Sequence, residues 1–497
     1  MCLWLKKKAV RTKCAKYFNH ITTIFIVIFN MKLNFKALSS RAAVIHILCQ
    51  WQKSRSTIDP FIERHTQEMT EPRDRQLVKA IVFGVLRNLN YLDFILGKFS
   101  RHPLAKMKDS AREALRSCLY QILFMDRVPE SAAINETIKA LKSQRQPKWL
   151  TGFVNGVLRN ICRNKDKIPA LNDALPFAVQ CNHPEWLLKR WQARFGKQET
   201  ANICRANNQP ASICLRINQN KTSRPEFLEL LAQHNYNARP GQAPEAVWLQ
   251  GGGAINILPG YKEGLFSVQD ETAQLITTLL APFTEVNYLD ACAGLGGKTM
   301  AMAQMVPAGS TIWAVEPQKA RQNLLSENLA RLDLQCCDQD RRRGINCFAG
   351  TLKEFTKTTK IDFQAILVDA PCSGLGVVGR HPDIRWNRQS DDLPRFQKTQ
   401  LALLQEASQI IAPGGIIVYT TCSMEATENE EVINMFLENQ PRFTISTAQV
   451  MPEQASNYLD EQGFLHTRPS EKIQDGFFAV RLTAPAKSRD KDIINDS

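Results

Sequence analysis

The sequence predicts a multidomain protein: an all-α front domain, a small α+β unit and a larger α/β domain. Apolar residues recur every three or four positions through residues 36–165, which is typical of packed amphipathic helices. From Val286 onward, strand, turn and helix patterns alternate, and such alternation predicts a doubly wound parallel sheet with helices on both faces. The third observation is the net charge of +15, which is unevenly distributed along the chain.

Charge separates the front of the chain from its back. Residues 31–170 carry 25 basic and 12 acidic residues, whereas residues 266–497 carry 22 basic and 29 acidic residues. A hydrophobic content of 44% and a charged content of 22% are those of a globular protein and exclude a collagen, a coiled-coil rod or a wholly disordered chain. The basic front domain is therefore the part expected to bind RNA or DNA.

The N-terminus and the cysteines limit the class of protein further. Six basic residues precede the apolar run at residues 21–29, which is shorter than the roughly 20 residues that cross a bilayer. No small-residue cleavage site follows, so we expect a natural start at Met31, an N-terminal extension over residues 1–31, and a cytoplasmic protein without a membrane segment. The 14 cysteines include no C-x-x-C pair, which favours reduced thiols over a metal site.

The front domain is expected over residues 32–168 as a bundle of helices with basic loops and ends. Ser39 or Ser40 can cap the first helix, and Ser131 can cap the helix that follows a break at residues 128–130. Helical patterns fall within residues 42–49, 77–96, 111–125, 132–142 and 153–161.

Prolines 169 and 176 mark a linker, and the small α+β unit is expected over residues 169–265. Its helices are expected at residues 184–195 and 225–234, and its strands at residues 212–217 and 246–249. The α/β domain is expected over residues 266–483, before a flexible tail at residues 484–497. Its strands are expected at residues 286–291, 311–315, 345–349, 363–368 and 415–420.

A glycine-rich loop follows the first strand of the α/β domain, at the strand end where such sheets bind ligands. The loop consists of Cys292, Ala293, Gly294, Leu295, Gly296, Gly297 and Lys298. Cys292 stands where a P-loop needs glycine, and Thr299 stands at the last glycine of the dinucleotide fingerprint. The remaining interpretation is a loop for S-adenosylmethionine, with Glu316 after the second strand accepting hydrogen bonds from the ribose hydroxyls.

Two cysteines and an acid follow two other strands of this sheet. Asp369 and Cys372 follow the fourth strand and Cys422 follows the fifth, so we expect all three to face one pocket. A single cysteine is more often a small buried hydrophobe. Two thiols at neighbouring strand ends instead suit methylation at C5 of a pyrimidine, which needs a thiolate to add to C6, an acid at N3 and a base for the C5 proton. The base must also leave its stack.

The segments DAPCSG (369–374) and TTCS (420–423) resemble those of the RNA cytosine-C5 methyltransferases. The resemblance implies that Cys422 is the nucleophile, that Cys372 assists product release, and that Asp369 contacts the cytosine and lies near the cofactor. DNA cytosine methyltransferases use the cysteine of the PC segment instead, so the TCS cysteine favours RNA. Residues 380–386 resemble the segment after the active-site loop, and we expect them to contact the substrate.

Residues 128–142 and 153–160 resemble the NusB-type RNA-binding domain that precedes the catalytic domain in the Sun/Fmu branch of this family. That branch methylates cytosine 967 of 16S ribosomal RNA. The resemblance therefore implies an S-adenosylmethionine-dependent 16S rRNA cytosine-C5 methyltransferase, with free rRNA or an early small-subunit particle as its partner. We expect a monomer that uses no metal.

The chain departs from the family at the cofactor site. Its loop reads CAGLGGK where the family has CAAPGGK, and Glu316 replaces the more frequent Asp. Thr351 stands where an Asp is expected to contact the adenine; Asp338 and Asp340 lie nearby, but neither is assigned this role. Two alternatives stay open: another rRNA or tRNA site as the target, and a non-catalytic RNA-binding assembly factor.

Overall fold

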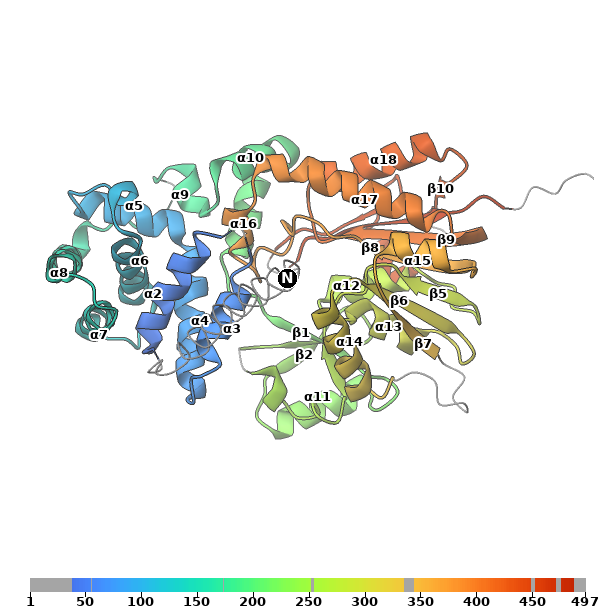
Figure 1. Ribbon diagram of the computed structural model, residues 1–497, viewed down its shortest axis with the longest axis horizontal. Coiled ribbons are helices and arrows are strands. Elements are labelled where there is room, and N and C mark those ends of the chain that lie inside the picture. Colours follow the sequence, from blue (N-terminus) through green and yellow to red (C-terminus); the bar gives the residue numbers. More distant parts are fainter. Residues whose placement is uncertain are drawn as a thin grey trace, which may run out of the picture. The chain divides into compact units, whose positions relative to one another are not determined.

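The structure is a computed structural model that describes residues 38–54, 56–172, 174–251, 254–334, 344–447, 452–470 and 475–486. The expected N-terminal extension, Asp338, Asp340 and the expected tail from residue 487 onward lie outside the described residues. The chain divides between Ala170 and Leu171 into two compact units, here called unit 1 and unit 2 (Figure 1).

Unit 1 is all-helical, as the sequence predicts. Its helices are α2 (Ser40–Trp51), α3 (Asp59–Thr66), α4 (Pro72–Arg87), α5 (Leu89–Phe99), α6 (Asp109–Phe124), α7 (Glu130–Ser143) and α8 (Lys148–Arg163). The Ser39 hydroxyl caps α2 by accepting a hydrogen bond from the Ala42 amide. α2 packs against α3, α4, α6 and α7, and its buried side chains, such as Ile45 and Leu48, form part of the core of this unit.

Unit 1 differs from the sequence prediction at three places. Asn88 separates α4 from α5 within the apolar stretch, and its side-chain amide donates to the Gly84 carbonyl at 2.9 Å. α7 begins at Glu130 after Pro129, so Ser131 lies inside the helix instead of capping it. Helix α3 was not predicted, because it has only eight residues and buries only Ile62 and Thr66.

No single helix in the described part of the chain is long and apolar enough to cross a membrane. Taken together, α4 and α5 have the length and apolar composition of a membrane span, but the two helices are bent by 78° relative to each other.

Unit 2 begins with the small α+β part. Its elements are α9 (Phe177–Cys181), α10 (Glu185–Asn207), β1 (Ile213–Ile217), α11 (Arg224–Gln233), β2 (Ala238–Pro240), β3 (Ala246–Leu249) and β4 (Phe266–Val268). The strands form an antiparallel sheet in the order β2-β3-β1-β4. Strands β2 and β4 were not predicted, because three residues are too few to show alternation. β4 extends this sheet beyond residue 265.

The α/β part carries the larger sheet. Its strands are β5 (Asn287–Asp290), β6 (Thr311–Glu316), β7 (Gly344–Ala349), β8 (Phe363–Asp369), β9 (Ile411–Thr421), β10 (Thr444–Ile445), β11 (Phe464–His466) and β12 (Phe478–Thr483). Strands β9-β8-β5-β6-β7 are parallel, as predicted, and are neighbours in this order, which confirms that β8 and β9 are adjacent. Strands β10, β11 and β12 were not predicted and make the sheet mixed: β12 pairs antiparallel with β9, and β10 and β11 pair antiparallel with β12. An apolar strand shows burial in its sequence but not its direction.

Helices cover both faces of this sheet (Figure 1). They are α12 (Glu271–Thr278), α13 (Gly297–Met305), α14 (Lys319–Arg331), α15 (Leu352–Thr358), α17 (Leu393–Ala407), α18 (Glu430–Asn439) and α19 (Glu453–Ser456). The short helix α16 (Ile384–Asn387) instead packs through Ile384 against residues of α10. Tyr288 and Leu367 join the core beneath α12, α13 and α14. Leu289 and Val368 join the opposite core, beneath α15, α17 and α18. This double cover leaves the carboxyl ends of β5, β6, β8 and β9 to form one functional edge.

A buried ion network inside unit 1 gives a test of its stability. Arg116 pairs with Glu113 at 2.8 Å and with Asp93 at 2.6 Å, and Glu113 is 1% exposed. Burial raises the pKa of Glu113, while Arg116 and Arg112 oppose that effect. Because Arg116→Met leaves this buried charge poorly compensated, it should lower the free energy of unfolding of unit 1 by about 3 kcal/mol.

The buried thiol of Cys118 on α6 reports this change in the full chain. Alkylation of Cys118, followed by peptide mass spectrometry across a urea series, should show an earlier midpoint in Arg116→Met. Lys139→Met, which breaks the exposed Lys139–Glu136 pair, should leave the midpoint unchanged. Equal midpoints for both variants would contradict the stabilising role of the network.

Candidate active site

The glycine-rich loop joins β5 to α13 and presents an open face. Gly294 and Gly296 have φ of 57° and 89°, in the left-handed region that favours glycine. A Cβ on Gly296 would lie 2.2 Å from Leu325, whereas one on Gly294 or Gly297 would meet nothing within 4 Å. The loop therefore leaves room for a ligand beside the first turn of α13, whose amides lack acceptors within the helix.

Two acidic residues, Asp290 and Glu316, accept hydrogen bonds at the start of this loop and at the end of the neighbouring strand β6. Asp290 accepts hydrogen bonds from the Cys292 amide and, at 2.7 Å, from the Thr299 hydroxyl. Burial raises the pKa of Asp290 to about 6, although the bond from Thr299 opposes the shift. Glu316 ends β6, is buried, and accepts from the Gln318 amide at 2.7 Å. The structure thus places Glu316 one strand away from the loop, at the same sheet edge.

Asp369 ends β8 and forms an ion pair with Lys298 of the loop, with 2.6 Å between Oδ2 and Nζ. Lys298 is 9% exposed, and burial by itself would lower its pKa. Asp369 and the nearby Cys422 outweigh burial, so the pKa of Lys298 is raised. The amine is consequently an ammonium, which connects the glycine-rich loop to the strand that leads to Cys372.

The structure brings Cys372 and Cys422 together, with 3.0 Å between the two sulfur atoms. Both are free thiols and both are partly exposed. The hydrogen bond with Cys422, together with burial, raises the pKa of Cys372 well above its ordinary value. The raised pKa favours the protonated thiol form of Cys372, and either sulfur can be the donor of the hydrogen bond between them.

A buried carboxylate, Glu428, ties together the residues that follow the two cysteines. Its oxygens accept from the Ser373 amide at 2.7 Å and from the Ser373 and Ser423 hydroxyls at 2.5 Å each. Gln400 of α17 adds a fourth hydrogen bond at 3.1 Å. Burial raises the pKa of Glu428, and these donors oppose the shift. Sequence analysis did not single out this role, although ENEE begins six residues after Cys422.

The segment at residues 380–386 differs from its expected role in substrate contact. Arg380 pairs with Asp475 at 2.5 Å and with Asp270 at 2.8 Å. Arg385 is fully buried and donates to the carbonyl of Asn182 and the side chain of Asn208. Both guanidinium groups are thus used inside unit 2, where they hold the small α+β part against the α/β part.

Thr351, at the position where the family has an adenine-contacting Asp, is the N-cap of α15. Its hydroxyl accepts from the Glu354 amide, and Glu354 accepts in return from the Thr351 amide at 2.8 Å. This residue therefore caps a helix. Among the described residues, no group of three or more His, Cys, Asp or Glu side chains could hold a metal ion.

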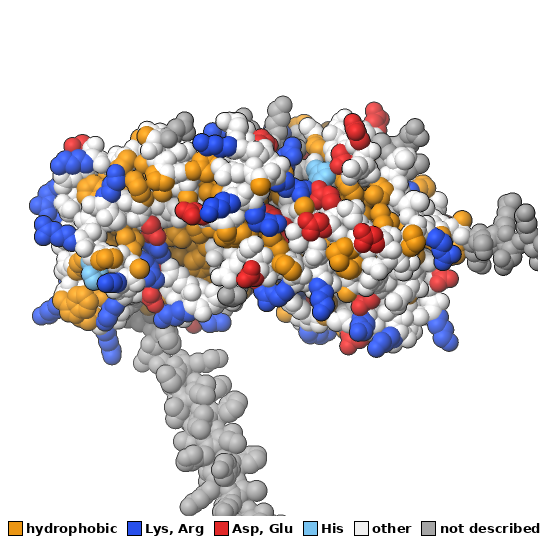
Figure 2. All heavy atoms as spheres, turned by 90° about the horizontal axis from the view of Figure 1, so that it is seen from above, with side chains coloured by type: hydrophobic (Ala, Val, Ile, Leu, Met, Phe, Trp, Pro, Cys, Tyr) orange, Lys and Arg blue, Asp and Glu red, His pale blue; other side chains and the backbone are white. Residues whose placement is uncertain are grey.

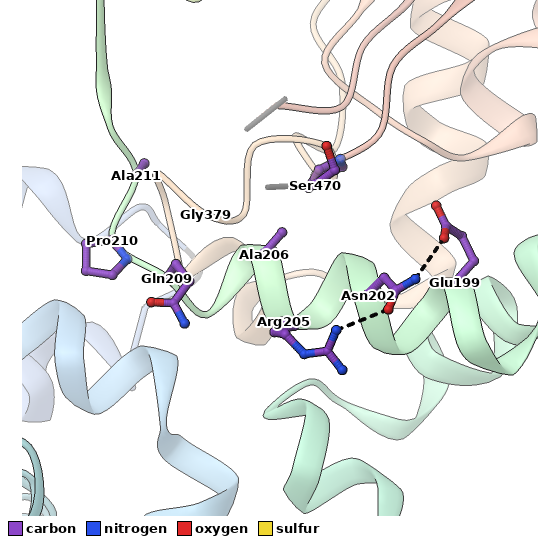
Figure 3. A pocket seen from close by; sticks show the side chains of 10 residues that line it. Glu199, Asn202, Arg205, Ala206, Gln209, Pro210, Ala211, Gly379 and Ser470 are labelled. Carbon is purple, nitrogen blue, oxygen red and sulfur yellow. Dashed lines mark hydrogen bonds between the residues drawn. The ribbon is translucent and has the colours of Figure 1, made fainter. Parts of the chain in front are cut away.

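Two hollows adjoin these loops. One, of about 700 Å³, lies along the C-terminal half of α10 beside Gly379 and Ser470, with Glu199, Asn202 and Arg205 joined by hydrogen bonds on its wall (Figure 3). The other, of about 500 Å³, begins at Ser423 and Met424, directly after Cys422. Its further lining includes Arg194, His466, Arg468 and Phe477. Neither Cys372 nor Cys422 is among the residues that line this second hollow.

Comparisons with known proteins agree with this architecture. Residues 277–483 match the family described as 16S rRNA methyltransferase RsmB/F, residues 38–163 match the NusB family, and residues 183–256 match a ferredoxin-like domain of RsmF/B-like methyltransferases. The solved structure of the protein PH0851 superposes with a TM-score of 0.74 at 20% identity, covering 90% of this chain and 99% of that one. This structural likeness confirms the predicted fold class.

Two curated relatives extend over nearly the whole chain. The ribosomal RNA small subunit methyltransferase B of Escherichia coli (strain 536) is 33% identical over 454 residues, covering 91% of this chain and 99% of the relative. The probable ribosomal RNA small subunit methyltransferase B of Bacillus subtilis (strain 168) is 33% identical over 424 residues, covering 82% and 90%. With its NusB-like, ferredoxin-like and methyltransferase parts in the same chain, this protein belongs to the ribosomal RNA small subunit methyltransferase B family, of the Sun/Fmu type.

Proposed function

We propose that this protein methylates C5 of one cytosine in 16S ribosomal RNA through a covalent adduct between Cys422 and C6. The observation that carries the proposal is the pair of thiols 3.0 Å apart at two adjacent strand ends, close to Asp369. The names of the curated relatives support rRNA as the substrate. Cytosine 967 is the proposed nucleotide, and the cytoplasm is the proposed location of the reaction.

S-adenosylmethionine is the cofactor, and it supplies an activated methyl group when bound. The residues present fit it: the open loop from Cys292 to Lys298 offers backbone amides, and Glu316 offers a carboxylate to ribose hydroxyls. Asp369 ends β8, which lies between β5 with its glycine-rich loop and β9 with Cys422. Its carboxyl group therefore borders both the cofactor site and the base.

The proposed reaction begins when the Cys422 thiolate forms a bond to C6 of the flipped cytosine. The electrons of the C5–C6 double bond move into the ring, which makes C5 nucleophilic. Negative charge develops at N3, and Asp369, which contacts N3, passes to it a proton from its ion-pair partner, the Lys298 ammonium; this proton returns to the pair by the time the base is released. C5 then accepts the methyl group and carries both a methyl and a hydrogen.

Product release needs a proton donor for sulfur and a proton acceptor for C5. Because the Cys372 sulfur lies 3.0 Å from that of Cys422 and its raised pKa favours the protonated thiol, Cys372 can protonate the departing sulfur of Cys422. The resulting Cys372 thiolate takes the C5 proton, whose bonding electrons re-form the C5–C6 double bond as the C6–S bond breaks. Cys372 regains its proton, and Cys422 loses one to solvent before the next cycle.

Two cysteine variants separate these roles. With cofactor and 16S rRNA, Cys372→Ala should accumulate a protein–RNA complex that survives denaturing electrophoresis, since attack remains and release is impaired. Cys422→Ala should form no complex, because it lacks the attacking sulfur. Absence of an adduct in Cys372→Ala, together with absence of methyl transfer by the unaltered chain, would overturn the proposed function.

Bisulfite sequencing of rRNA from cells lacking the protein should identify cytosine 967.

Glu428→Gln tests whether this carboxylate positions the thiols. An amide has one acceptor oxygen, so it cannot satisfy all four donors around Glu428. The kcat for methyl transfer should fall about tenfold or more while KM for RNA stays within about twofold, because small displacements of reacting groups are costly.

Glu425→Gln is the matched control for Glu428→Gln. Glu425 is also buried and lies in the Cys422 loop, but its carboxylate binds Arg190 and Trp191 instead of the serines that follow the two cysteines. Its kcat should remain within about twofold of the unaltered chain. A Glu428→Gln protein with unchanged kcat would show that the carboxylate has no positioning role.

A further inference from the structure

Unit 1 has a groove of about 510 Å³ where the C-terminal end of α5 meets α8. Its lining residues are Phe99, Arg101, His102, Phe153, Gly156, Val157 and Asn160. The groove is remote in sequence from every residue assigned above to catalysis. It combines aromatic rings, an amide and a cation on one open surface.

One stripe of α8 forms the floor of the groove, because Phe153, Gly156, Val157 and Asn160 are spaced three or four residues apart. The Asn160 amide donates to the Phe99 carbonyl at 3.3 Å, which joins α8 to the end of α5. The His102 ring meets the Phe153 ring edge to face, with 6.2 Å between centroids and an interplanar angle of 85°. These contacts fix the wall and leave the His102 ring exposed.

The two segments around the groove carry a net positive charge, and Asp93, Asp109, Glu136 and Asp166 flank them directly in the sequence. Residues 94–108 and 137–165 contain 11 Lys and Arg residues and no Asp or Glu. Several of these cations form no ion pair with any described residue: Lys98, Arg101, Lys106, Lys108, Arg159 and Arg163. Lys and Arg side chains gather at the α5–α8 end of unit 1 (Figure 2). Such a surface suits a polyanion.

Two glycines on α8 leave the surface beside the groove bare. A Cβ on Gly152 or Gly156 would meet nothing within 4 Å, so no packing within the chain requires glycine there. Each glycine in a helix destabilises it by about 1 kcal/mol relative to alanine. A ligand that approaches the helix backbone closely would explain why these two positions carry no side chain.

We propose that this groove binds unpaired bases of the ribosomal RNA, by stacking on the Phe153 and His102 rings, while Arg101 and Arg159 neutralise the flanking phosphates. The inference rests on the proposed function, because it assigns the same RNA a second point of attachment. Aromatic faces accept only unstacked bases, whereas a duplex would offer the cations its phosphates alone. The open aromatic surface therefore favours a single strand.

Binding of the full-length chain to two probes tests the groove: a single-stranded oligoadenylate of about 12 nucleotides and a duplex of the same length. Phe153→Leu combined with His102→Ala should weaken single-strand binding about tenfold and leave duplex binding within about twofold. Arg101→Gln combined with Arg159→Gln should weaken both and reduce the salt dependence of single-strand affinity by about 0.7 per phosphate contact.

Phe124→Leu is the matched control, since this ring of unit 1 is 39% exposed and stacks on Tyr120 outside the groove. It should change neither affinity, and protection of Cys118 from alkylation verifies that each variant is folded.

Equal losses of affinity for the single strand and the duplex would overturn base stacking. Unchanged RNA affinity in both groove variants would overturn the proposal and is the result expected if a protein occupies the groove. Failure of the proposed function is distinguishable, because the unaltered chain would then transfer no methyl group.

Discussion

The buried carboxylate of Glu428 is the interaction on which the geometry of the active site depends. Cys372 and Cys422 lie at the ends of different strands, 50 residues apart in sequence, and their serine neighbours both bind this one side chain. Removing a carboxylate from water is unfavourable unless hydrogen bonds replace its hydration. Here four protein donors do so, and the same bonds fix the two loops in a common position.

The sheet gives this arrangement its framework. Because β9, β8, β5 and β6 are parallel neighbours, their carboxyl ends place Cys422, Asp369, the glycine-rich loop and Glu316 along one edge in that order. Lys298 crosses from the loop to Asp369 and joins the cofactor side of the edge to the thiol side. A methyl donor held at the loop and a base held at Cys422 would thus share one site without any change of fold.

Local patterns predicted the parts of this protein whose structure depends on local chemistry. The five parallel strands and the helices of unit 1 other than α3 could be found because periodic burial leaves a periodic sequence. The closeness of Cys372 and Cys422 could also be predicted, since adjacent strands in such sheets end at one edge. The antiparallel direction of β12 could not, because the residues of a strand buried on both faces carry no mark of direction.

The roles of individual polar side chains were harder to predict, because their partners are distant in sequence. Glu428 binds Ser373 across 55 residues, and Arg385 binds Asn182 across more than 200. The expectation that residues 380–386 contact substrate was therefore wrong for these arginines, which fill internal sites. Thr351 similarly looks like a loss of the cofactor-contacting acid, although its spacing to Glu354 is the Thr-x-x-Glu pattern of a capping box, which the folded chain forms.

The central claim is that Cys422 attacks the base and Cys372 serves its release. The most direct measurement uses the unaltered chain with 16S rRNA in which 5-fluorocytidine replaces cytidine, because fluorine at C5 cannot leave as a proton does and the adduct persists. After digestion with protease and nuclease, mass spectrometry locates the modified cysteine. The account predicts a methylated fluorocytidine attached to the peptide containing Cys422. Attachment to the peptide containing Cys372 would contradict it.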